Sequence, residues 1–114
     1  METQYITWHD FEKVEIRTGT IVRAEKATGV KKQAYRLWID FGEKIGVKKT
    51  SAQLTDYYDT ETLSGKQIVA VFNFPPKQIG TFMSECLVLG AVDSEGRVTL
   101  LQTERNCDDG QRIA

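Results

Sequence analysis

The sequence lacks most of the residues from which metal and nucleophile sites are built. Its 114 residues include one histidine and two cysteines. His9 has no orienting partner or companion ligand nearby in the sequence, and Cys86 and Cys107 fit no metal-ligand spacing. We therefore expect free thiols and no metal site. No apolar run approaches the ~20 residues that span a bilayer, and the first ten residues are not a secretion signal, so we expect a cytoplasmic protein without membrane insertion.

Catalytic motifs are missing as well. The chain has no GxxxxGK[ST] phosphate loop and no other glycine-rich loop that would cradle phosphates. The acidic pair Asp108-Asp109 lies in a polar tail, where neither carboxylate is shielded as acid–base catalysis requires. We therefore expect a protein that is not an enzyme, with no catalytic residues and no cofactor.

The net charge of −1 conceals an uneven distribution along the chain. Residues 17–49 contain nine Lys or Arg and three Asp or Glu, a balance of +6. The remaining residues contain six Lys or Arg and thirteen Asp or Glu, a balance of −7. Such a split predicts one basic face suited to a polyanion, unless folding scatters the charges again.

Alternating polar and apolar residues predict a β-rich single domain. We expect strands over residues 16–27, 34–41, 45–49, 67–74, 85–92 and 98–101, a helix over 8–14 capped by Asp10, and a helix from Thr50-Ser51 through Asp56. Gly19 predicts a bulge or sharp coil in the first strand. A helix between the third and fourth strands is typical of the OB-fold, an all-β five-stranded Greek-key barrel. The boundaries are a helical lead-in at 1–15, the barrel at 16–101 and an extension at 102–114.

Three groups of residues would bind a polyanion if the fold unites them. They are Lys31, Lys32 and Arg36; Lys48 and Lys49 with Ser51 and Gln53; and the segment 73–79 followed by Ser84. Basic side chains attract phosphates, while Asn, Gln and Ser bond to bases and sugars. Trp38 shares a strand face with Arg36, and it either stacks a base or packs in a subunit interface. Asn73 is a polar residue in an apolar strand, which predicts a specific partner.

Several segments resemble a known family. In chain order they are Phe11–Val22, Tyr35–Gly42, Lys49–Gln53, Asn73–Ile79 and Ser84–Gly90. The first resembles the opening strand of the tRNA-binding domain that is also appended to some methionyl- and phenylalanyl-tRNA synthetases. Together the five resemble the stand-alone CsaA proteins, a subgroup described as tRNA-binding and as chaperone-like in protein export. The resemblance extends over roughly residues 10–114.

This resemblance implies an OB-fold, no catalysis, and a homodimer whose interface uses the N-terminal helix and the segments after the barrel. By position it implies a tRNA-binding face of Lys49, Ser51, Asn73, Lys77, Gln78 and Ser84, to which charge and strand direction add Arg36 and Lys48. We expect Trp8, Phe11 and Trp38 at the dimer interface.

Two functions follow from these residues. The first is tRNA binding by a homodimer. The second is a chaperone-like binding of unfolded or exported polypeptides, which needs exposed apolar side chains. Phe82 and Met83, in a loop after Gly80, are the candidates for that role, whereas Phe72 and Phe74 are expected in the core.

Overall fold

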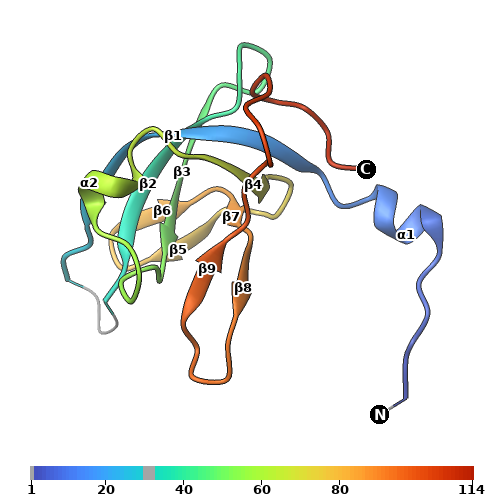
Figure 1. Cartoon of the computed structure of the whole chain (residues 1–114), viewed down its shortest axis with the longest axis horizontal. Coiled ribbons are helices and arrows are strands. Elements are labelled where there is room, and N and C mark those ends of the chain that lie inside the picture. Colours follow the sequence, from blue (N-terminus) through green and yellow to red (C-terminus); the bar gives the residue numbers. More distant parts are fainter. Residues whose placement is uncertain (1, 30–32) are drawn as a thin grey trace.

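A single antiparallel sheet forms the body of the protein. The structure is a computed structural model that describes residues 2–29 and 33–114, so Lys31 and Lys32 lie outside the described residues. The strands are ordered β3-β2-β1-β4-β7 (Figure 1). They comprise β1 (Ile16–Lys26), β2 (Tyr35–Asp40), β3 (Val47–Ala52), β4 (Gln67–Val71) and β7 (Leu87–Val88). The predicted all-β, OB-like barrel is confirmed.

The sheet closes where the free edge of β3 meets the chain leading into β7. The Glu85 backbone N–H donates to the Lys49 carbonyl at 2.8 Å, and a carboxylate oxygen of Glu85 accepts from the Lys49 N–H at 3.0 Å. The buried Thr50 hydroxyl donates to the Cys86 carbonyl at 2.6 Å. These bonds satisfy an edge that would otherwise be open, and they make the barrel nearly closed.

The first strand contains a bulge, but not at the predicted glycine. The register of β1 against β2 shifts between Ile21 and Arg23. Val22 and Arg23 therefore both face solvent, and Ala24 returns to the core. An extra residue in one strand has this effect.

Gly19 is required for a different reason. It is buried, and a Cβ at this position would lie 2.7 Å from Ile39 Cγ2 and 2.8 Å from a ring carbon of Phe41. Two core side chains thus pack directly on the Gly19 backbone. The prediction that Gly19 itself forms the bulge is wrong.

The two helices are short, and both differ from expectation. Helix α1 (Trp8–Glu12) is capped by Thr7, and Asp10 is the reciprocal partner in the capping box. The helix expected from residue 50 is absent because β3 continues through Ala52 and Thr50 bonds across the barrel closure. The helix between β3 and β4 is instead α2 (Thr60–Leu63), capped by Asp59.

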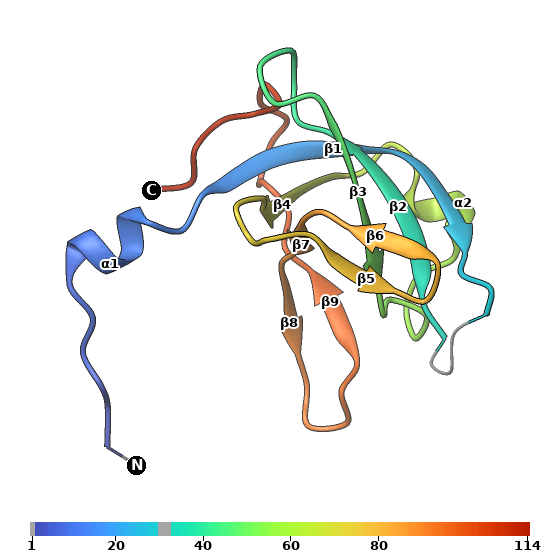
Figure 2. The same cartoon turned by 180° about the vertical axis from the view of Figure 1, so that it is seen from behind.

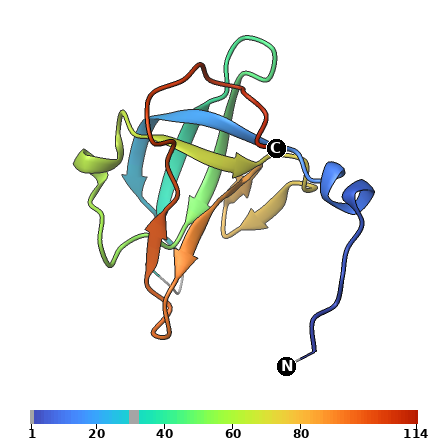
Figure 3. The same cartoon turned by 45° about the vertical axis from the view of Figure 1, so that its right-hand side comes forward.

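Two hairpins extend from the barrel. One pairs β5 (Lys77–Ile79) with β6 (Phe82–Ser84), and the other pairs β8 (Gly90–Val92) with β9 (Val98–Leu100). Residues 85–92 therefore do not form one strand. The β5–β6 hairpin lies in front of β3 (Figure 2), on the opposite side of the barrel from α2 (Figure 3).

The two ends of the chain differ in how they pack. Residues 102–114 cross the first half of β1, where the Thr18 N–H donates to the Gln111 carbonyl and Gln67 holds the Cys107 backbone. Helix α1 buries none of its residues and stands away from the barrel (Figure 1). No helix in the described part of the chain is long and apolar enough to cross a membrane.

Candidate nucleic-acid interface

Four of the predicted residues lie together on one face of the barrel. Arg36 and Trp38 alternate with buried residues of β2, and Ser51 and Lys49 are their register partners on β3. Because neighbouring residues in register project to the same side of a sheet, these four side chains share its outer surface. We call Arg36, Trp38, Lys49 and Ser51 the outer face.

Phe82 of the β5–β6 hairpin contacts three of the four residues of the outer face. Its ring packs edge-on against Trp38, with 5.7 Å between the centroids. The guanidinium carbon of Arg36 lies 4.9 Å from the Phe82 ring centroid, and Lys49 Nζ lies 5.1 Å from it. Cations over an aromatic ring are held by its quadrupole. Phe82 thus docks the hairpin on the sheet and positions two cations.

This packing corrects the expectation for Phe82. The side chain is only 7% exposed, so it is not available as an apolar contact for a polypeptide. Its neighbour Met83 is 39% exposed. Phe74 was expected in the core, but it is exposed because the chain leaves the barrel after β4, whereas Phe72 is half-buried against Phe41.

The cations of the outer face are free of acidic partners. Among the described residues, Arg17, Arg23, Arg97 and others form ion pairs, but no carboxylate lies within ion-pair distance of Arg36 or Lys49. Within residues 2–29 and 33–114, the Arg36 guanidinium donates only to the Thr28 carbonyl, at 3.3 Å. Glu25, the register partner of Arg36 on β1, pairs with Arg23 instead, so Arg36 and Lys49 remain available to phosphate.

The β5–β6 hairpin carries three further predicted residues. Lys77 is the register partner of Ser84, and Gln78 is the partner of Met83. Phe82 faces the barrel, so the Lys77–Ser84 pair faces it too and the Gln78–Met83 pair faces solvent. The Ser84 hydroxyl lies 2.9 Å from the Thr50 hydroxyl, which ties the hairpin to the barrel closure.

Two predicted residues are separated from the outer face. Lys48 is in register with the fully buried Ile39, so it points to the opposite side of β3 from Lys49. Asn73 accepts from the Glu15 N–H at 3.0 Å and donates to the Lys13 carbonyl at 2.7 Å. The specific partner predicted for Asn73 is therefore the backbone between α1 and β1.

The three residues expected at a dimer interface occupy two regions. Trp8 and Phe11 contact each other on α1, with ring centroids 5.4 Å apart, and Trp8 is 66% exposed. Tyr5 and Ile6, just before the helix, are also exposed. Trp38 lies apart from them on the outer face, in contact with Phe82.

Sequence reasoning missed Arg23, which lies beside the outer face. The bulge at Val22 brings Arg23 opposite Trp38, and its guanidinium carbon lies 4.7 Å from the Trp38 ring centroid. Glu25 pairs with Arg23 at 2.8 Å. Strict alternation gives no signal for this contact, because it predicts Arg23 on the same side as the buried Ile21.

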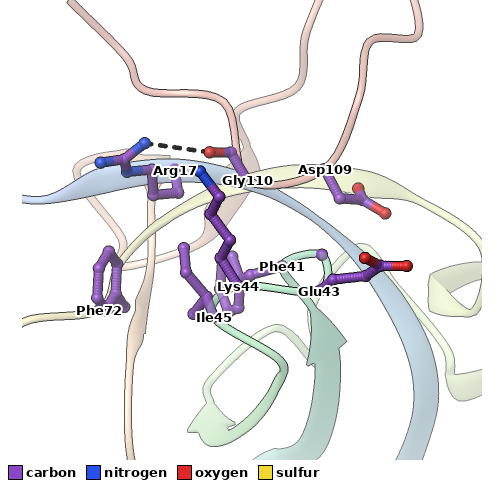
Figure 4. A pocket seen from close by; sticks show the side chains of 9 residues that line it. Arg17, Phe41, Glu43, Lys44, Ile45, Phe72, Asp109 and Gly110 are labelled. Carbon is purple, nitrogen blue, oxygen red and sulfur yellow. Dashed lines mark hydrogen bonds between the residues drawn. The ribbon is translucent and has the colours of Figure 1, made fainter.

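A pocket of about 590 Å³ lies elsewhere, between β1, the turn after β2 and the C-terminal extension. Arg17 and Lys44 point over its apolar floor of Phe72 and Ile45 (Figure 4). Arg17 donates to the Gly110 carbonyl at 3.2 Å and pairs with Glu15. The basic segment 17–49 is therefore divided between this pocket and the outer face.

A smaller apolar groove borders the hairpin. Its volume is about 270 Å³, and it is lined by Phe74, Pro75, Lys77, Ser84, Glu85, Cys86 and Leu87. Phe74 and Leu87 are both about half exposed. Burial raises the pKa of the Cys86 thiol to about 12, so this cysteine carries no reactive thiolate near neutral pH.

Comparisons with known proteins identify the family and the fold. The family described as "Putative tRNA binding domain" matches residues 16–112. The chaperone CsaA of Bacillus anthracis is 44% identical, with a TM-score of 0.92, over 97% of this chain and 100% of that one. The CsaA chaperone protein of Picrophilus torridus is 46% identical, with a TM-score of 0.90, over 96% and 100%.

A longer relative matches over part of its length. The methionine–tRNA ligase of Caldanaerobacter subterraneus is 33% identical over 110 residues, which cover 96% of this chain and 17% of the ligase. The chain thus spans only a small part of that enzyme.

Proposed function

The chain belongs to the family of putative tRNA-binding domains, and we propose that it is a non-catalytic protein that binds tRNA as a homodimer. The observation that carries this proposal is that Arg36 and Lys49 both lie over the Phe82 ring and that neither forms an ion pair with any described residue. Phosphate contacts supply most of the affinity of a protein for nucleic acid, and the outer face offers such contacts beside Ser51 and an aromatic ring.

The tRNA-binding experiment uses charge reversal on the proposed face. The double variant Lys49→Glu, Lys77→Glu should weaken binding of a tRNA transcript strongly and reduce the slope of log K against log salt by about 0.9 for each phosphate that the variant no longer binds. Lys66→Glu is the matched control, since Lys66 lies beside Tyr58 and its backbone N–H donates to the Leu63 carbonyl of α2. Helix α2 lies on the other side of the barrel (Figure 3). An unchanged slope in the double variant would count against this face.

The homodimer is supported by the exposed aromatic residues of the N-terminal segment. A five-residue helix is too short to persist in water without tertiary contacts. Helix α1 nonetheless exposes Trp8, and Tyr5 before it is 91% exposed. An unpartnered apolar segment of this kind is suited to a second copy of the chain. Two tRNA sites in one assembly would then add avidity.

Sedimentation or light scattering tests the dimer. Trp8→Ser should shift the protein toward monomer, because it removes an exposed apolar ring from the proposed interface. Val92→Ser is the control, since Val92 is 65% exposed on the distant β8–β9 hairpin and should leave the mass unchanged. A monomeric parent protein would overturn the homodimer.

A second candidate function is chaperone-like polypeptide binding. The observation that favours it is the groove between Phe74 and Leu87, whose lining is largely apolar. Leu87 lines this groove, and Met83 is exposed on the neighbouring strand β6. Met83→Ser with Leu87→Ser should reduce the suppression of aggregation of an unfolded client while leaving tRNA binding intact. Undiminished suppression in that variant would remove the support for this function.

A further inference from the structure

One face of the Trp38 ring is covered by an exposed side chain that can move away. Arg23 lies over the ring at 4.7 Å, and the Arg23 side chain is 64% exposed. Its ion-pair partner Glu25 is also exposed and lies on the same strand. Exposed cation–π contacts and exposed ion pairs are both weak, so solvent or a ligand can displace Arg23 at little cost. Trp38 also packs against Phe82 at an interplanar angle of 80°, and Phe82 is fixed by burial.

The side chains around Trp38 are of the kinds that bind one unpaired nucleotide. Lys49, its register partner on β3, and Arg36, two residues away on β2, supply cations on the same face of the sheet as the ring. Ser51 adds a hydroxyl on the same face. Unpaired bases in RNA are held by stacking on aromatic rings while neighbouring cations hold the flanking phosphates. A paired base offers no free ring face to such a site.

We propose that the Trp38 ring face now covered by Arg23 is a stacking site for one unpaired base of the bound tRNA. The inference rests on the proposed tRNA binding and adds to it the part of the RNA that is recognised. The incoming base displaces Arg23, which remains near Glu25 or moves to a flanking phosphate. Arg36 and Lys49 hold the phosphates on either side of the stacked nucleotide.

The two tryptophans allow a direct test. In Trp8→Phe the only tryptophan is Trp38, and in Trp38→Phe the only one is Trp8. A tRNA transcript should quench Trp38 emission in step with binding, because a stacked base quenches indole fluorescence, and should leave Trp8 emission unchanged. A blunt RNA duplex of similar length, which has no unpaired base, should leave Trp38 emission unchanged.

Affinity and salt dependence provide the second test. Trp38→Leu keeps an apolar contact with Phe82 but cannot stack a base, so tRNA affinity should fall by about tenfold, as expected for one base that no longer stacks. The salt slope should stay unchanged, because every phosphate remains bound. Lys49→Gln is the matched variant, and it should reduce the slope by about 0.7, the value for one phosphate of a single strand. Circular dichroism checks that both variants fold.

The outcomes separate this inference from the function on which it rests. Stacking is overturned, and tRNA binding stands, if tRNA binds the parent protein without quenching Trp38 emission and binds Trp38→Leu with the same affinity. If Trp38 emission changes with protein concentration instead, Trp38 belongs to a subunit interface and stacking is again overturned. If tRNA does not bind the parent protein, both ideas fail together.

Discussion

Replacing Phe82 with alanine separates its structural role from a direct contact with a ligand. Loss of a buried phenylalanine costs about 3–5 kcal/mol, and Phe82 is 7% exposed. The β5–β6 hairpin lies at the surface and can relax, so we take about 3 kcal/mol. The two cation contacts with Arg36 and Lys49 add about 0.5–1 kcal/mol each. A domain of 114 residues has roughly 6–17 kcal/mol of stability, so Phe82→Ala should remain folded.

Urea unfolding measures this effect. We expect the free energy of unfolding to fall by about 4 kcal/mol in Phe82→Ala and by less than about 1 kcal/mol in Met83→Ala, its exposed neighbour. tRNA affinity should fall in Phe82→Ala because Arg36 and Lys49 lose their support, while the salt slope should persist because both charges remain. A decrease in stability below about 1 kcal/mol would refute the docking of the hairpin through Phe82.

Four other predictions concern positions away from the outer face. Gly19→Ala should lower the free energy of unfolding by about 1–3 kcal/mol in urea titrations, because the added methyl meets Ile39. Asn73→Ala should weaken dimerisation in sedimentation experiments without weakening tRNA binding to the monomer, because Asn73 fixes the chain that leads to α1. A thiol reagent at about pH 8 should label Cys107 and spare Cys86 in the native protein. The pKa of Cys86 is raised from 9.0 to about 12, so the unfolded chain releases this proton first, and stability should fall as the pH rises from 9 toward 12. Cys86→Ala should lack that fall.

The strands of the barrel were predictable because their signal is local. In β2, Leu37 and Ile39 alternate with Arg36 and Trp38. Leu37 and Ile39 are buried in the barrel, whereas Arg36 and Trp38 are half-buried on the side of the β5–β6 hairpin. The charge-rich first half of the chain and the residues shared with the tRNA-binding family pointed to the outer face as well. The burial pattern along each strand depends on the period of two residues that a half-buried strand imposes.

The remaining features depend on contacts between distant segments. Thr50 resembles a helix cap in the sequence, but its hydroxyl bonds to the Cys86 carbonyl, which no local pattern reveals. Helix α2 has its own cap at Asp59, a residue whose pKa is lowered chiefly by the Thr62 backbone N–H that it accepts from. Tertiary structure decides whether a given Ser, Thr or Asp caps a helix or bonds across the closure of a barrel.

The bulge at Val22 shows how one such contact alters the site. Without the register shift, Arg23 would point into the barrel beside Ile21, and an unpaired arginine there would be strongly destabilising. With the shift, Arg23 covers Trp38 and Ala24 takes its place against the core. The same extra residue therefore protects the core from a charge and places a third cation beside the outer face. Deleting Val22 would restore simple alternation with Ile21 inward, Arg23 outward and Ala24 inward, so both effects require the strand to accommodate one extra residue at this position.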